Sequence, residues 1–134
     1  MTNQYGFGTR CVHAGQEEPD PATGARAPPI YQTSSYVFDD AETAADRYAL
    51  ADDGNVYSRF DNPTVRMLEQ RLASLEGAVD AVATGSGMAA LDAATTVLAS
   101  AGDNVVSASS IYGGTHSYLA NTASQRGIET RFVD

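Results

Sequence analysis

Apolar side chains recur at helical spacing after Pro63. Asn62 is a favourable N-cap, and proline fits the first helical position because its missing N–H would have no partner there. Gly77 is the expected end of this helix. The apolar positions between them form one stripe that a helix would bury, made up of Val65, Leu68, Leu72 and Leu75.

Beyond Gly77 the pattern alternates between short apolar runs and longer helical segments. The predicted strands cover 78–83, 104–108 and 129–133, and the predicted helices cover 87–101 and 115–126. Strands separated by helices of this length indicate an α/β domain with a parallel sheet. Three parallel strands alone would leave exposed edges, so we expect 61–134 to be the first part of a larger domain.

Residues 1–60 have the pattern of an extended arm with one short helix. Turn-forming residues fill 19–24, and Pro28 and Pro29 block a helix or a central strand, so 1–38 is expected to be irregular. Apolar residues within it indicate that the arm packs on something else. Acidic residues then start a helix expected over 41–50.

Composition narrows the possible partners of the chain. Its 134 residues are 43% hydrophobic and 19% charged, which is typical of a globular protein. The net charge of −9 disfavours binding to nucleic acid or to an anionic membrane. All 8 basic residues are arginine, and we take this acidic, lysine-free composition as halophile-like, with chance in an alanine-rich sequence as the alternative.

Cysteine and histidine offer little chemistry here. The single cysteine, Cys11, excludes an internal disulfide, and with no signal peptide or apolar membrane segment visible we expect a cytoplasmic protein. His13 lies almost beside Cys11, but sequence neighbours of this kind are poor support for a thiol nucleophile. His13 and His116 are too far apart in sequence to predict a metal site.

The segment Thr84-Gly85-Ser86-Gly87-Met88 joins a predicted strand to a predicted helix. The first turn of a helix has free N–H groups and a partial positive charge, which together favour a phosphate. Glycines would let the backbone approach that phosphate, and Ser86 adds a hydroxyl donor. The alternative is a tight turn that needs glycine for its conformation alone.

Two nucleotide-binding motifs resemble this turn but lack an essential residue. Gly85-x-Gly87-x-x-Ala90 matches a dinucleotide fingerprint, yet the next strand ends in Ser109-Ser110 without the carboxylate that would hold a ribose. A Walker loop requires a lysine, which the chain does not contain. A nucleotide-binding α/β module therefore remains only a distant alternative.

Two further segments carry aromatic and arginine side chains that could contact a cofactor. Arg59 can fork onto a phosphate and Tyr57 can donate to it, although Tyr57 packing and Arg59 in solvent would be ordinary. Tyr112 follows the strand 104–108, at the sheet edge expected to carry the 84–88 turn. An aromatic ring there can stack on a flat cofactor, whereas Tyr112 taken alone is more typical of a packing or loop residue.

Together these motifs resemble the N-terminal third of the Cys/Met-metabolism family of pyridoxal-phosphate enzymes, over about 7–134. Within the family the segments 14–26 and 54–57 look most like the O-acetylhomoserine sulfhydrylases, although Met88 departs from the glutamine frequent in that branch. The motifs that carry the resemblance are Val12-His13-Ala14-Gly15, residues 29–36, Tyr57-Ser58-Arg59, Asn62-Pro63-Thr64, Leu75-Glu76-Gly77, Ser86-Gly87-Met88 and Tyr112-Gly113-Gly114-Thr115.

The resemblance implies a role for each matching residue. Ser86, Gly87 and Met88 would bind the phosphate of pyridoxal 5'-phosphate, mostly through backbone N–H groups. Tyr57 and Arg59 would reach the phosphate in a neighbouring subunit's site. Tyr112 would stack on the pyridine ring and take part in proton transfer or in departure of the leaving group. The implied fold is the start of the large domain of an aspartate-aminotransferase-like (fold type I) enzyme, preceded by the arm.

The implied activity is the displacement of acetate from O-acetylhomoserine by a sulfur nucleophile, giving homocysteine or methionine. The implied assembly is a homotetramer, a dimer of dimers. Alternatives within the family are cystathionine γ-synthase, cystathionine γ-lyase and methionine γ-lyase. The family's chemistry also needs a lysine that holds the cofactor, expected beyond residue 134, so the chain alone is expected to be inactive. A non-catalytic, truncated remnant is the remaining alternative.

Overall fold

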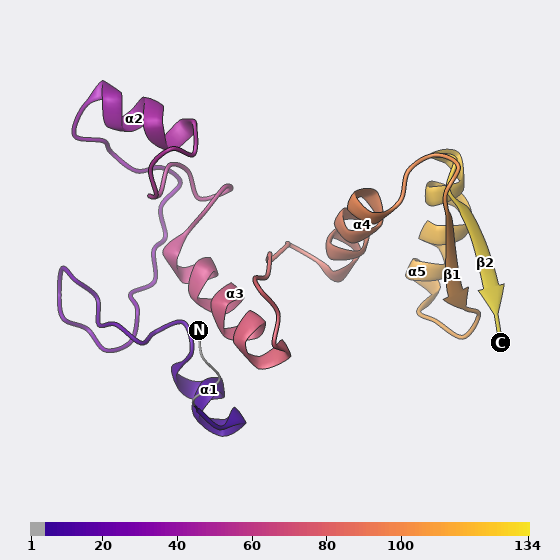
Figure 1. Ribbon diagram of the computed structural model, residues 1–134, viewed down its shortest axis with the longest axis horizontal. Helices are drawn as coiled ribbons and strands as arrows, with labels where there is room; N and C mark the ends of the chain where they lie inside the picture. Colours follow the sequence, from indigo (N-terminus) through magenta and orange to yellow (C-terminus); the bar gives the residue numbers. More distant parts are fainter. Residues whose placement is uncertain (1–4) are drawn as a thin grey trace. The chain divides into compact units, whose positions relative to one another are not determined.

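The computed structural model describes residues 5–134 (Figure 1). The described residues up to Ala83 form one compact unit, and Thr84–Asp134 form a second. The sequence-based boundary between the arm (1–60) and the α/β domain (61–134) is a different division of the chain, and it stays a prediction. No helix within residues 5–134 is both long enough and apolar enough to cross a membrane.

The first unit is built around α3 (Pro63–Glu76), which has the predicted bounds. The Asn62 side chain accepts a hydrogen bond from the Thr64 N–H, and Gly77 ends the helix with φ 69°. The shorter α2 (Ala41–Tyr48) begins where predicted, because the Asp40 carboxylate caps the Thr43 N–H. It stops before Leu50, whose φ of 57° is incompatible with a right-handed helix.

The expectation of an irregular stretch over 1–38 is wrong in one segment. Residues Phe7–His13 form α1, while residues 1–4 lie outside the described part of the chain. Helix α1 is stabilised by contact with α3: the Arg10 guanidinium donates to the Ser74 carbonyl, and the Arg71 Nε donates to the Ala14 carbonyl at 2.8 Å. Local propensity gave no sign of this helix, because its formation depends on residues about sixty positions away.

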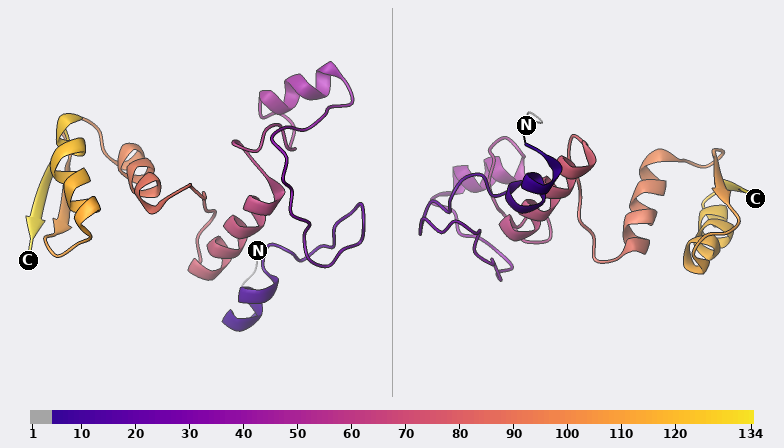
Figure 2. Two further views of the ribbon diagram at one scale, coloured as in Figure 1. Left: turned by 180° about the vertical axis from the view of Figure 1, so that it is seen from behind. Right: turned by 90° about the horizontal axis from the view of Figure 1, so that it is seen from below.

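The second unit contains a two-stranded parallel sheet. Strands β1 (Asn104–Ala108) and β2 (Glu129–Val133) have the predicted bounds, and Asn104 lies opposite Glu129. Helix α4 (Gly87–Leu98) precedes the sheet, and α5 (Gly113–Ser117) follows β1. Figure 2 shows the helical segment after β1 lying along the strands. A small core is formed by Tyr118, Leu119, Ala123 and Ile128.

Three other predicted elements differ in the structure. The strand predicted over 78–83 does not form, because no strand among the described residues pairs with it; Val79 and Val82 are exposed and the Ala83 N–H bonds to Glu69 Oε1 at 2.7 Å. The helix predicted over 115–126 begins earlier, at Gly113, and continues as the π-helical segment η1 (Tyr118–Ala123). The helix predicted over 87–101 ends at Leu98.

Candidate functional site

The 84–88 turn has the geometry of a capped helix N-terminus. Ser86 is the N-cap of α4, and its Oγ accepts a hydrogen bond from the Ala89 N–H at 3.1 Å. The Thr84 hydroxyl donates to the Ser86 carbonyl at 2.9 Å and closes the turn. The N–H groups of Gly87 and Met88 belong to the first turn, where an α-helix provides no acceptor, so they are available to an anion.

The glycines of this turn are not explained by backbone conformation. Gly85 and Gly87 both lie outside the left-handed region in which glycine is favoured. A Cβ added at either position would meet no atom of the described residues within 4 Å. These observations argue against a turn that needs glycine only for its conformation. They show open space beside the free N–H groups, which fits the close approach of a phosphate.

Met88 contributes to this turn through its backbone. Its side chain is partly buried and packs against the core formed by Tyr118, Leu119, Ala123 and Ile128. The Met88 side chain is therefore part of the hydrophobic packing of the second unit. A methionine at this position leaves the phosphate-binding capacity of the turn unchanged, because that capacity comes from N–H groups.

Tyr112 lies after the carboxyl end of β1 and immediately before α5. Its carbonyl accepts a hydrogen bond from the His116 N–H at 3.0 Å, which holds its backbone at the helix start. The residue remains 75% exposed, so it is not buried as a packing residue within this unit. The predicted common sheet edge for Tyr112 and the 84–88 turn stays a prediction, because no strand precedes the turn among the described residues.

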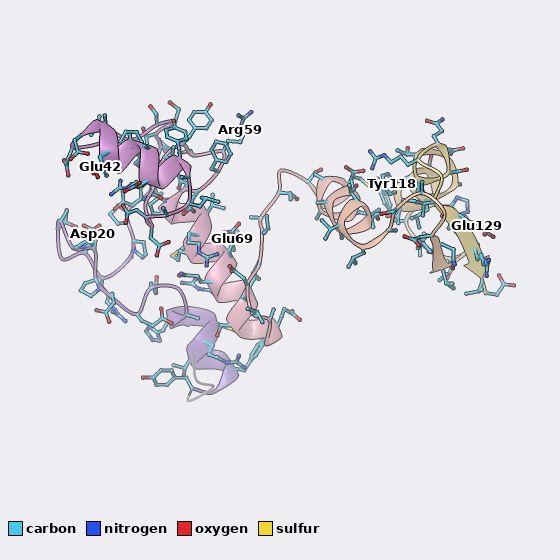
Figure 3. The ribbon with its side chains drawn as sticks, turned by 45° about the horizontal axis from the view of Figure 1, so that its top comes forward. Asp20, Glu42, Arg59, Glu69, Tyr118 and Glu129 are labelled. Atoms are coloured by element: carbon cyan, nitrogen blue, oxygen red, sulfur yellow. The ribbon has the colours of Figure 1, made fainter. Side chains whose placement is uncertain are left out.

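A side-chain cluster that sequence spacing did not reveal links α4 to the segment after Tyr112. The Tyr118 hydroxyl and the Arg126 guanidinium both donate to Asp92 Oδ1, at 2.8 Å and 2.6 Å. The Tyr118 hydrogen bond, followed by that of Arg126, holds the pKa of the Asp92 carboxyl below its usual value. Burial, followed by the Asp92 hydrogen bond, raises the pKa of Tyr118, which Figure 3 labels. The three residues are 26 and 34 positions apart, so no local pattern could have found them.

Tyr57 and Arg59 lie in the first unit. Tyr57 forms an antiparallel bridge with Ser35 of the arm. The Arg59 guanidinium carbon lies 5.6 Å from the Tyr57 ring centre and 5.8 Å from that of Phe60. Figure 3 shows the Arg59 side chain extending away from its unit, and within residues 5–134 it forms no ion pair. Its charge is therefore available to an external anion.

Asn62 joins the Tyr57–Arg59 segment, the arm and α3. Besides capping the helix, its Nδ2 donates to the Tyr31 carbonyl and to Ser58 Oγ, each at 2.9 Å. Asn62 is buried, with 6% of its surface exposed. The cap was predicted from sequence, whereas the two donated bonds were not, because Tyr31 lies thirty-one positions earlier. Asn62 therefore positions the loop that presents Arg59.

The structure thus distributes the predicted residues between its two units. Ser86, Gly87, Met88 and Tyr112 lie in the second unit, and Tyr57 and Arg59 lie in the first. No group of three or more His, Cys, Asp or Glu residues that could hold a metal ion is found within the described part of the chain.

Comparison with known proteins supports a common origin over nearly the whole chain. It is 52% identical over 132 residues to the O-acetyl-L-homoserine sulfhydrylase of Corynebacterium glutamicum, covering 98% of this chain and 30% of that protein. It is 53% identical over 127 residues to O-acetyl-L-homoserine sulfhydrylase 1 of Thermus thermophilus, covering 95% of this chain and again 30% of the relative. The chain therefore spans about a third of the length of these relatives.

A solved structure shows the same fold. The crystal structure named as an O-acetylhomoserine (thiol)-lyase of Campylobacter jejuni matches with a TM-score of 0.88 and 40% identity, covering 97% of this chain and 32% of that one. That crystal structure contains a pyridoxyl-lysine phosphate group. The fold is accordingly the N-terminal part of a fold type I enzyme, as the sequence indicated. Residues 8–134 match the model of the Cys/Met metabolism PLP-dependent enzymes, and the chain belongs to this family.

Proposed function

We propose that this chain is the N-terminal segment of an enzyme in which a sulfur nucleophile replaces the acetoxy group of O-acetylhomoserine, which leaves as acetate. The observation that carries the proposal is the 84–88 turn, whose free N–H groups face open space beside two glycines. The names of the two relatives described above support the substrate. The expected product is homocysteine if the nucleophile is sulfide, or methionine if it is methanethiol.

Different residues of the chain bind different parts of the cofactor. When bound, pyridoxal phosphate supplies an electron sink for the carbanion at the amino acid's α-carbon. The N–H groups of Gly87 and Met88 and the Ser86 hydroxyl bind its phosphate. The exposed ring of Tyr112 stacks on its ring, and the Tyr112 hydroxyl accepts or returns a proton. Arg59, with Tyr57 beside it, adds positive charge at the phosphate of a neighbouring subunit.

The test uses a chimera in which residues 1–134 replace the matching segment of the Corynebacterium glutamicum enzyme. Purified chimera is assayed with O-acetylhomoserine and sulfide, and separately for γ-lyase activity on cystathionine and methionine. We expect the chimera to form homocysteine from O-acetylhomoserine and sulfide. A chimera that prefers the γ-lyase substrates would overturn the proposed substrate and favour a lyase of the same family.

Arg59→Ala tests the cofactor site in the same chimera. A charge-assisted hydrogen bond contributes about 1.5–3 kcal/mol, so the dissociation constant for pyridoxal phosphate should rise roughly ten- to a hundredfold. The matched control is Arg26→Ala, because Arg26 is another arginine of the first unit and, within residues 5–134, donates only to the Glu17 carbonyl. An Arg59→Ala affinity within twofold of the control would refute the assignment of Arg59.

Three further properties belong to the proposal. The chain alone is inactive, because its sequence contains no lysine to hold the cofactor covalently; turnover by the isolated chain would contradict this. The complete enzyme is a cytoplasmic homotetramer, a dimer of dimers. The exposed apolar residues Ile30 and Val37 on the arm support contact with another subunit. Light scattering on the chimera checks the assembly, and a monomer would contradict it.

A further inference from the structure

Gly114 occupies a position where glycine has no conformational reason to be. It is the second residue of α5, and its φ lies outside the left-handed region. An alanine could adopt the same backbone conformation. Glycine within a helix destabilises it by about 0.5–1 kcal/mol relative to alanine. The feature that requires glycine here is therefore steric.

The atom that a side chain at residue 114 would meet belongs to Tyr112. A Cβ built on Gly114 would lie 2.5 Å from Tyr112 Cε1 and 3.2 Å from both Cδ1 and Cζ. Carbon atoms in contact are ordinarily about 3.5–4.0 Å apart, so the ring would have to move by roughly 1 Å or more. The neighbouring Gly113 differs, since a Cβ there would meet nothing within 4 Å.

Few other contacts hold the ring of Tyr112. The residue is 75% exposed, so packing against the unit does not determine the orientation of its side chain. Its backbone is fixed by the hydrogen bond from the His116 N–H. A side chain at residue 114 would therefore exclude the ring from the position it now occupies.

We infer that Gly114 is a positioning residue, which provides the space in which the Tyr112 ring lies over the first turn of α5. This inference rests on the proposed function for its catalytic consequence, because Tyr112 is the residue assigned to the cofactor ring. A displacement of about 1 Å in a reacting group can cost up to a hundredfold in rate. Gly114 would thus influence the reaction without contacting substrate or cofactor.

The test combines ring position with a double-mutant cycle in the full-length chimera. Crystal structures of the chimera, of Gly114→Ala and of Gly113→Ala give the position of the Tyr112 ring without any need for turnover. We expect the ring to move by roughly 1 Å or more in Gly114→Ala, and to stay in place in Gly113→Ala. An unmoved ring in Gly114→Ala overturns the inference.

The cycle separates an effect through Tyr112 from general structural damage. Gly114→Ala should lower kcat/KM by roughly ten- to a hundredfold when Tyr112 is present, and by less than twofold in a Tyr112→Ala background. Equal losses in both backgrounds overturn the positioning role. If the ring moves but Tyr112→Ala leaves kcat/KM unchanged, the steric inference stands and the proposed role of Tyr112 fails.

Discussion

Gly15→Ala is the glycine substitution that we expect to lower the stability of the first unit most. The φ of Gly15 is 81°, a conformation that L-residues avoid, and Gly15 directly follows the end of α1. A Cβ at residue 15 would lie 2.5 Å from the carbonyl oxygen of Met67, which is part of the α3 backbone. Unlike a side chain, a helix backbone has no alternative rotamer, so α1 and α3 would have to move apart.

The expected cost of Gly15→Ala has two parts. A left-handed conformation costs an L-residue about 1–2 kcal/mol. Overlap that forces packed elements apart costs about 1–3 kcal/mol more. The free energy of unfolding should therefore fall by about 2–5 kcal/mol.

Gly77→Ala is the matched control for the steric part. Gly77 also follows a helix and has φ 69°, but a Cβ there would meet nothing within 4 Å. It should lose only the conformational part, about 1–2 kcal/mol. Urea denaturation followed by circular dichroism measures both variants, with an unchanged m-value as the condition for comparing them. Equal losses in the two variants would refute the close approach of Gly15 to α3.

Three other predictions concern the charged and polar contacts. The pKa of Asp92 is lowered by its hydrogen bonds from Tyr118 and Arg126, so its stabilisation is present above the ordinary value near 3.8 and is lost as the pH falls through the lowered value. Asp92→Asn should remove that part of the acid sensitivity in melting temperatures recorded from pH 2 to 6, whereas an unchanged profile would count against it. Asn62→Ala should lower the free energy of unfolding by about 2–4 kcal/mol, because it removes the helix cap and the hydrogen bond to the Tyr31 carbonyl. Asn62→Asp should retain the cap and lose only the hydrogen bonds that the amide donates. The net charge of −9 predicts a melting temperature that rises between 0.1 and 2 M NaCl as self-repulsion is screened, and a flat response would contradict the halophile-like interpretation.

Local signals predicted those elements whose cause is local. Helix α3 has its cap, its proline and its terminal glycine within its own sequence, and both strands have the bounds that their apolar runs indicated. Helix α1 depends on distant residues of α3, and the segment 78–83 lacks a pairing partner among the described residues, so the sequence pattern was wrong at both. A contiguous motif such as 84–88 can be recognised as a candidate site from the sequence, whereas residues that are distant in sequence and meet in space, as at Asp92, give no local pattern.

The glycines of the chain fall into two groups, and the difference bears on function. Several take left-handed φ values and shape the backbone, as Gly15 and Gly77 do. Gly85, Gly87 and Gly114 do not, so at these positions glycine offers only space. At Gly114 the Tyr112 ring occupies that space, whereas at Gly85 and Gly87 no atom of the described residues does. A glycine that neither bends the backbone nor accommodates a neighbour is unfavourable for the chain by itself. Because Gly113 shares both properties, the space alone does not identify a ligand site; at the N-terminus of α4 the argument for an anionic group rests on that space together with the free N–H groups of Gly87 and Met88.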